Sequence, residues 1–225
     1  TEGKLRSMKT HGVTRISINP QSMKEHTLEL LGRKHTVEEI REKFMLARTL
    51  GFDNINMDLI AGLPEETLED FKETLREVEA LKPDSITVHT LVIKRASRLR
   101  KEQLEQGGEM REEDACIEPM QKEAEQFCRV HGYEPYYMYR QKNKAHTTRN
   151  TNQENVAYAK PGKECLYNIF IMEELQSILA LGSGGSSKIV FPEENRMERV
   201  ENVKSVDDYI GRIDEMIRRK KESWR

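Results

Sequence analysis

The sequence contains few cysteines and no long hydrophobic run, which excludes several classes of protein. Only three residues of 225 are cysteines, at positions 116, 128 and 165, and none forms a CxxC pair. We therefore expect neither a disulfide scaffold nor a metal site made of cysteines alone. No apolar run approaches the roughly 18 residues of a membrane span, and the polar, basic start of the chain is unlike a signal peptide. These absences predict a cytoplasmic protein.

Neither sign of charge is in large excess. Lys and Arg number 37 and Asp and Glu 39, so the net charge is −2. This balance argues against a protein that coats nucleic acid or binds a membrane surface. Charged residues make up 34% of the chain and aromatic residues only 6%, but strongly periodic apolar segments argue against disorder. We expect one large globular domain or two small ones.

The first part of the chain repeats a unit in which an amphipathic helix ends at Gly or Pro and a β-branched strand follows. Expected helices cover residues 36–50, 67–81 and 113–131, and expected strands cover 13–18, 54–60, 85–88 and 133–137. Thr36 followed by Glu39 is a capping box for the first of these helices. This alternation predicts parallel β/α units, in either part of a (β/α) barrel or a doubly wound sheet.

The pattern changes after about Tyr139. Residues 140–163 predict a polar loop, and 168–172 predict a strand. Residues 188–191 and 197–203 predict a short hairpin, and 205–219 predict one helix. We therefore divide the chain into a β/α region, residues 1–143, and an accessory α+β region, residues 144–225.

Ligands of parallel β/α folds bind at the carboxyl ends of the strands. Candidate residues that follow the expected strands are Gln21, Arg33, Asp58, His89, Lys94, Arg95, Arg140 and Lys142. Most of them have an ordinary alternative interpretation as solvated loop residues. Asp58 differs because an acid inside an apolar strand must be paired or bound to a ligand if it is buried.

Two segments are basic and contain no acid. They cover residues 91–101 and 140–153, and both follow strands on the expected active face. Converging cations suit a small anionic molecule with several carboxylates or phosphates. The alternative is an ordinary basic surface.

Five segments carry a resemblance to a known family. They are Arg15–Met23, Gly32–Arg33, Gly51–Pro64, Tyr136–Asn143 and Glu154–Tyr158. They resemble the oxygen-independent coproporphyrinogen III oxidase family of radical SAM enzymes, in particular its HemZ-type coproporphyrinogen dehydrogenase branch. The resemblance implies the C-terminal part of a radical SAM partial (β/α) barrel, S-adenosylmethionine and a [4Fe-4S] cluster as cofactors, and coproporphyrinogen III as substrate. It also implies an oxidoreductase that decarboxylates propionate side chains to vinyl groups in haem biosynthesis.

The same resemblance implies roles for individual residues. Gln21, Arg33, Asp58 and Val92 match positions that contact S-adenosylmethionine in the family. The basic residues near the strand ends suit the propionates of the tetrapyrrole. These candidate substrate-binding residues are Lys94, Arg95, Arg140 and Lys142.

The sequence departs from the family in three respects. The family's acid that contacts S-adenosylmethionine upstream of Gln21 is absent, and the segment from Lys144 to Gln153 is a few residues longer than in the family. The third departure is the most consequential. The family's CxxxCxxC cluster motif is absent, so we expect no metal ligand in this chain, cluster ligands upstream of Thr1, and an N-terminally truncated and inactive chain. Two alternatives stay open. One is a haem-binding chaperone of the same superfamily, and the other is a cluster-free β/α-barrel enzyme that acts on another anionic metabolite.

Overall fold

The computed structural model describes residues 1–91, 117–140 and 154–224. They form two compact units, Thr1–Glu164 and Cys165–Arg225. The boundary lies later in the chain than the expected division after residue 143. The reason is a strand in the expected polar loop, β5 (Glu154–Ala159), which pairs with strands of the first unit.

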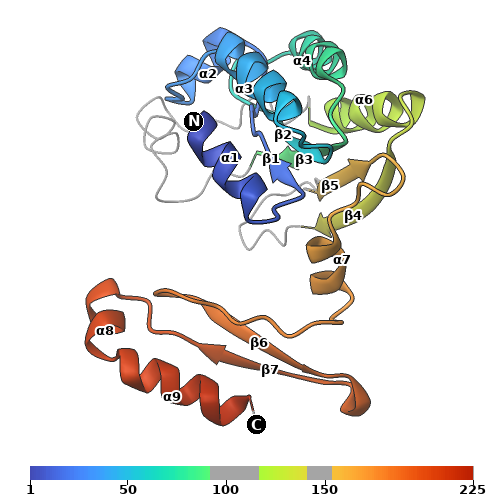
Figure 1. Ribbon diagram of the computed structural model, residues 1–225. Coiled ribbons are helices and arrows are strands. Elements are labelled where there is room, and N and C mark those ends of the chain that lie inside the picture. The colour runs from blue at the N-terminus through green and yellow to red at the C-terminus, as the bar shows by residue number, and fades with distance from the viewer. Residues whose placement is uncertain (92–116, 141–153, 225) are drawn as a thin grey trace, which may run out of the picture. The chain divides into compact units, whose positions relative to one another are not determined.

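The first unit is built on a mixed sheet with the strand order β1-β2-β3-β5-β4 (Figure 1). The other four strands are β1 (Ile16–Ser17), β2 (Ile55–Ala61), β3 (Ser85–Thr90) and β4 (Glu134–Arg140). The first three are parallel, as expected, but β5 runs antiparallel between β3 and β4. The expectation that residues 140–163 form only a loop was therefore wrong. Ala157, Tyr158 and Ala159 of β5 are buried, and Val156 is partly buried against the core.

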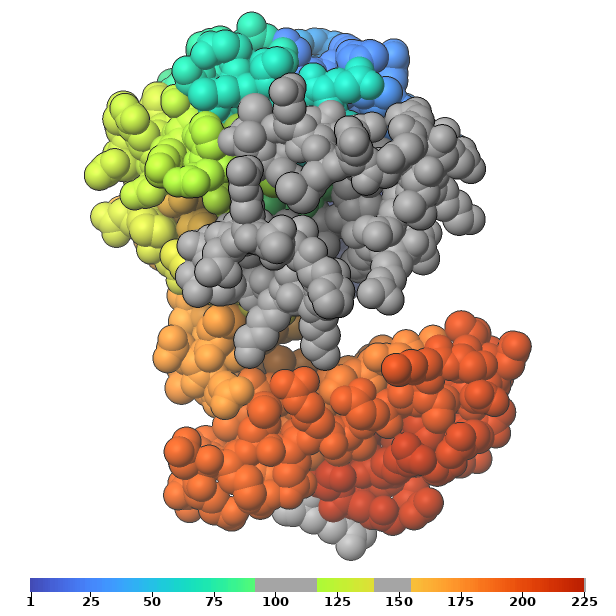
Figure 2. Space-filling model, turned by 180° about the vertical axis from the view of Figure 1, so that it is seen from behind, coloured from blue at the N-terminus to red at the C-terminus, as the bar shows by residue number. Residues whose placement is uncertain are grey.

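The helices of the first unit that the structure describes are α1 (Glu2–Thr10), α2 (Glu25–Leu30), α3 (Val37–Thr49), α4 (Leu68–Leu81) and α6 (Ile117–Val130). Capping boxes begin α3 at Thr36 and α4 at Thr67, so these two helices start where the local sequence indicates. Figure 2 shows α4 and α6 side by side at the surface of this unit.

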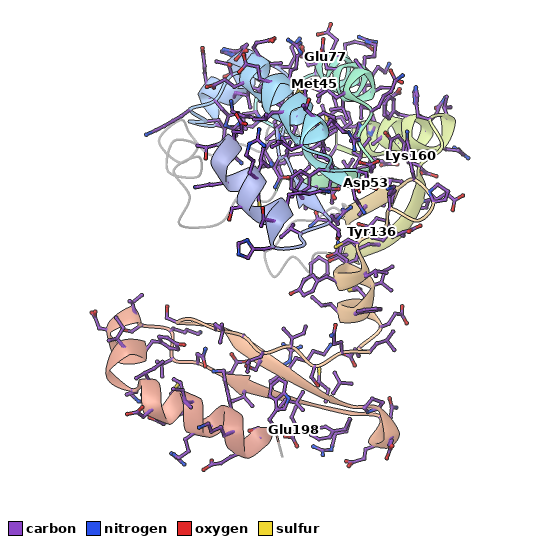
Figure 3. All side chains as sticks on the ribbon, viewed as in Figure 1. Met45, Asp53, Glu77, Tyr136, Lys160 and Glu198 are labelled. Carbon is purple, nitrogen blue, oxygen red and sulfur yellow. The ribbon has the colours of Figure 1, made fainter. Side chains whose placement is uncertain are left out.

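The core of the first unit lies between one face of the sheet and the helices α3, α4 and α6. Phe44, Phe71 and Met120 from these helices are fully buried against Met57 and Leu59 of β2. By contrast, Met45 lies on the outer surface of α3 and is 56% exposed (Figure 3). Among the described residues these helices cover a single face, so the other face of β1, β2 and β3 is left for a site.

The second unit contains a hairpin of β6 (Ser186–Phe191) and β7 (Arg196–Glu201), joined by the short 3₁₀ helix η2 (Pro192–Glu194). Its helices are α7 (Leu166–Met172), α8 (Val206–Gly211) and α9 (Ile213–Ser223). The hairpin was expected. The single helix expected over 205–219 is instead divided at Arg212, which ends α8 and begins α9.

The strand expected over residues 168–172 was wrong, because this segment lies in helix α7. A short apolar run fits a helix or a strand equally well by its pattern alone. The position beside β6 is taken by Ile178, which exchanges backbone hydrogen bonds with Lys188. Tertiary pairing, which the local pattern does not contain, therefore selects the helix.

Candidate functional site

Polar side chains alternate with apolar ones along β2 and β3. Asn56 and Asp58 lie opposite Ser85 and Thr87 in the parallel register, and His89 lies opposite Ile60. Successive side chains of a strand point to opposite faces, and the intervening apolar residues pack against the helices. The face without those helices therefore carries a row of amide, carboxylate, hydroxyl and imidazole groups.

Asp58 lies in the middle of this polar face. Its side chain is 20% exposed, and its Oδ2 lies 3.7 Å from Nε2 of His89. Asn56 donates from Nδ2 to Oδ1 of Asp58 at 2.6 Å. Burial acts to raise the pKa of the Asp58 carboxyl, but His89 and the Asn56 hydrogen bond outweigh burial and hold that pKa below its usual 3.8. Asp58 is therefore ionised at neutral pH and can accept hydrogen bonds from a ligand.

Gln21 is held against β2 next to Asp58. Its backbone N–H donates to the Asp58 carbonyl at 3.0 Å, and its own carbonyl accepts from the N–H of Ile60 at 2.9 Å. The φ angle of Gln21 is +69°, a left-handed conformation that is uncommon for a residue other than glycine. The structure therefore places the backbone of Gln21 beside that of Asp58, while the Gln21 side-chain amide donates to the Asn19 carbonyl.

A buried hydrogen-bond network holds the segment after Gln21. Ser22 is fully buried, and its hydroxyl donates to Glu66 in the loop after β2. Thr74 of α4 accepts from the backbone N–H of Met23 at 3.2 Å. Burial raises the pKa of the Glu66 carboxyl above its usual 4.5. This network ties the end of the β1 segment to the loop after β2 and to α4, and so supports the position of Gln21.

Two of the remaining expected site residues, Arg33 and Arg140, lie within the part of the chain that the structure describes. Arg33 lies exposed in the loop between α2 and α3, and it has no ion-pair partner among the described residues. Arg140 is the last residue of β4. The others lie outside the described residues; they are Val92, Lys94, Arg95 and Lys142. His89, chosen from its position at a strand end, lies beside Asp58.

The described residues fit the nucleoside cofactor but not the cluster. The ionised Asp58 and the neighbouring polar groups suit ligand hydroxyl or amino groups, and the exposed Arg33 suits a carboxylate. No group of three or more His, Cys, Asp or Glu side chains in the described part of the chain is placed to hold a metal ion. Cys128 is buried on α6, and burial raises the pKa of its thiol to about 12, which suits a core residue.

Sequence reasoning missed Asn56, Ser85 and Thr87. Each is at least nine-tenths buried, and all three take part in the hydrogen-bond network around Asp58. The available signal was the alternation of polar residues at 54, 56 and 58 and at 85, 87 and 89. The apolar character of these segments drew attention to the core, whereas the period of two marked the site face.

Comparison with known proteins finds a superfamily and several named relatives. The profile of the radical SAM superfamily matches residues 1–78. The oxygen-independent coproporphyrinogen-III oxidase-like protein HemZ of Bacillus subtilis is 44% identical over 214 residues, which are 95% of this chain and 41% of HemZ. This chain carries a radical SAM domain and is similar to HemZ over nearly its whole length.

Other relatives of this radical SAM chain differ in their named function. The heme chaperone HemW of Escherichia coli is 29% identical over 81% of the chain and 42% of HemW. The solved structure of coproporphyrinogen III oxidase (HemN) from Escherichia coli, described as a radical SAM enzyme, superposes with a TM-score of 0.67 at 20% identity. The superposition covers 96% of this chain and 46% of HemN. This likeness confirms the expected radical SAM fold.

The radical SAM chain spans less than half the length of the relatives described above. These relatives include proteins named as oxidases and proteins named as heme chaperones. The activity of this chain is therefore a separate question from its similarity to them. No helix among residues 1–91, 117–140 and 154–224 has the length and apolar character needed to cross a membrane.

Proposed function

We propose that this chain is part of an oxygen-independent coproporphyrinogen III dehydrogenase, a radical SAM oxidoreductase of haem biosynthesis. The observation that carries the proposal is the ionised carboxylate of Asp58, held next to Gln21 on the helix-free face of the sheet. The 44% identity to HemZ supports the same conclusion. We expect the protein to act in the cytoplasm, where a reducing environment suits free thiols such as Cys165.

Four residues of the chain would hold S-adenosylmethionine. Asp58 would accept hydrogen bonds from ribose hydroxyls or from the amino group, and Gln21 would contribute its side-chain amide. Arg33 would pair with the methionine carboxylate, because a guanidinium matches the geometry of a carboxylate. Val92 would contribute an apolar contact to the same ligand.

The chemistry itself comes from the cofactors. S-adenosylmethionine on a reduced [4Fe-4S] cluster supplies a 5′-deoxyadenosyl radical in this family. A propionate side chain that gives up one hydrogen atom, CO₂ and one electron becomes a vinyl group. The described residues contain no site for the cluster, so its ligands would have to come from outside them. We propose Lys94, Arg95, Arg140 and Lys142 as cations for the substrate propionates.

Cofactor binding is tested first, with isothermal titration of S-adenosylmethionine into this chain. We expect Asp58→Asn and Arg33→Ala each to weaken binding by about tenfold or more, since each removes a charged hydrogen-bond partner. The matched control is Asp53→Asn, which neutralises a side chain that lies exposed at the start of β2 and pairs with Lys163 (Figure 3). Unchanged affinity in Asp58→Asn would contradict the proposed site.

The reaction is tested with a protein that joins this chain to a segment bearing a CxxxCxxC motif. Under anaerobic and reducing conditions we expect conversion of coproporphyrinogen III to protoporphyrinogen IX, measured by chromatography. Stable haem binding without that product would favour the haem-chaperone alternative, which the HemW relatives represent. Turnover of another anionic metabolite without iron or S-adenosylmethionine would reject both.

A further inference from the structure

Asn56 lies at the centre of the hydrogen bonds around Asp58. It is 4% exposed and sits on β2, two residues before Asp58 on the same face of the sheet. Its Nδ2 donates to Ser17 Oγ at 2.8 Å and to Asp58 Oδ1 at 2.6 Å. Its Oδ1 accepts from the hydroxyls of Ser85 and Thr87, each at 3.0 Å. All four hydrogen-bonding positions of the amide are therefore used.

These four bonds leave the amide a single orientation. A flipped amide would direct its oxygen at the Asp58 carboxylate, which has no proton to donate at neutral pH. The hydroxyls of Ser85 and Thr87 come from β3 and that of Ser17 comes from β1, so the parallel sheet itself sets the amide plane. In turn, the Asn56 donor occupies Oδ1 of Asp58.

The network also extends to the segment before Gln21. Ser17 donates to Oδ1 of the Asn19 side chain at 2.5 Å, and the backbone carbonyl of Asn19 accepts from Nε2 of Gln21 at 3.4 Å. Hydrogen bonds thus connect the Asp58 carboxylate through Asn56 and Ser17 to the Asn19 side chain, whereas Gln21 contacts the backbone of Asn19. The other oxygen of Asp58, Oδ2, faces His89 at 3.7 Å, beyond hydrogen-bond distance.

We propose that Asn56 is a positioning residue that orients the Asp58 carboxylate for binding S-adenosylmethionine. The inference rests on the proposed function, in which Asp58 and Gln21 contact this cofactor. It adds a residue that does not itself touch the ligand. Its contribution is preorganisation, because a carboxylate already held in place loses less freedom on binding.

The first test is independent of any ligand and uses NMR titration of the Asp58 carboxyl in the full chain. In Asn56→Leu the carboxyl keeps its burial but loses its donor, so its pKa should rise above that in the unsubstituted chain. In Asn56→Asp two carboxylates face each other, and the apparent pKa values of the pair should separate. A pKa of Asp58 unchanged in both variants would overturn the proposal.

The second test measures binding of S-adenosylmethionine by the same variants. We expect Asn56→Leu and Asn56→Asp to weaken binding by about tenfold, a usual effect of losing a hydrogen bond to a charged group. The matched control is Asn202→Asp, at a position of equal burial in the second unit whose amide donates to Gly182. Circular dichroism checks that each variant is folded.

The outcomes separate this inference from the proposed function. If Asp58→Asn binds normally, or if the unsubstituted chain does not bind, the proposed function fails and the inference fails with it. If Asp58→Asn loses binding while both Asn56 variants bind normally, only the role of Asn56 is overturned. Loss of binding in folded Asn56 and Asp58 variants, but not in Asn202→Asp, supports both.

Discussion

At the scale of single residues, burial and hydrogen bonding decide which polar groups are functional. Asp58 lies on β2 and Glu66 lies in the loop after β2, and the pKa values of these two carboxylic acids move in opposite directions. Asp58 has His89 and Asn56 beside it, and these favour the ionised form. For Glu66 burial is the largest effect, and the Ser22 hydroxyl only partly offsets it. The first acid suits ligand binding, whereas the second suits a structural role.

Glu66 predicts a specific pH dependence of stability. A carboxyl whose pKa is raised on folding stabilises the folded chain most below its usual value of 4.5, and this contribution is lost as the pH rises through the raised pKa. Glu66→Gln lacks this titration. We therefore expect the free energy of unfolding of Glu66→Gln, relative to that of the unsubstituted chain, to increase between pH 4 and pH 8, measured by urea denaturation.

The matched control for this prediction is the neighbouring acid. Glu65 is exposed, and its Oε2 lies 3.0 Å from Nε2 of His26, so Glu65→Gln should show a much smaller change with pH. A stability difference for Glu66→Gln that stays constant over the whole range would contradict the burial argument.

At the scale of the elements, local capping sets where the helices of the first unit begin. In α4 the Asp70 carboxylate accepts from the backbone N–H of Thr67 at 3.0 Å and from its hydroxyl at 2.6 Å. These bonds lower the pKa of Asp70 to about 2. Thr74 of α4 contacts the Ser22 hydroxyl and accepts from the N–H of Met23, in the network that supports the position of Gln21. The stability of α4 therefore also affects the site.

Asp70→Ala should destabilise the chain by about 1 kcal/mol, the usual cost of losing a cap. The pH-dependent part of this contribution is present above the ordinary pKa of 3.8 and is lost as the pH falls toward 2, since the folded pKa is depressed. Chemical denaturation at pH 7 measures the cost. The control is Glu69→Ala in the same helical turn, whose exposed side chain pairs only with Lys72 and should change stability far less. Equal effects of the two substitutions would contradict the capping role.

At the scale of the whole molecule, the two units differ in how much core each contains. The hydrophobic core cluster lies entirely in the first unit, from Met23 to Tyr158. In the second unit only Ile189 and Met216 are buried hydrophobic residues among those described. A two-stranded hairpin is marginally stable without further packing. The first unit should therefore carry most of the folding free energy.

A chain of residues 1–164 should fold on its own, unfold cooperatively in urea and keep its affinity for S-adenosylmethionine. All the described residues of the candidate site lie within this range. Residues 165–225 alone should show no cooperative transition by circular dichroism. Loss of cooperative unfolding in the 1–164 chain would show that the second unit contributes to the core of the first.

The sequence by itself determined the parallel order of the first three strands, the starts of α3 and α4, and the choice of Asp58 as a candidate ligand residue. These features depend on residues within a few positions of each other, through apolar periodicity, capping boxes and helix-ending residues. Only the tertiary structure decided that β5 enters the sheet and that Asn56 is held beside Asp58 by residues of β1 and β3. Each of these depends on pairing between strands distant in sequence, such as Ser17 with Asn56 and Asn56 with Ser85, which no local pattern contains.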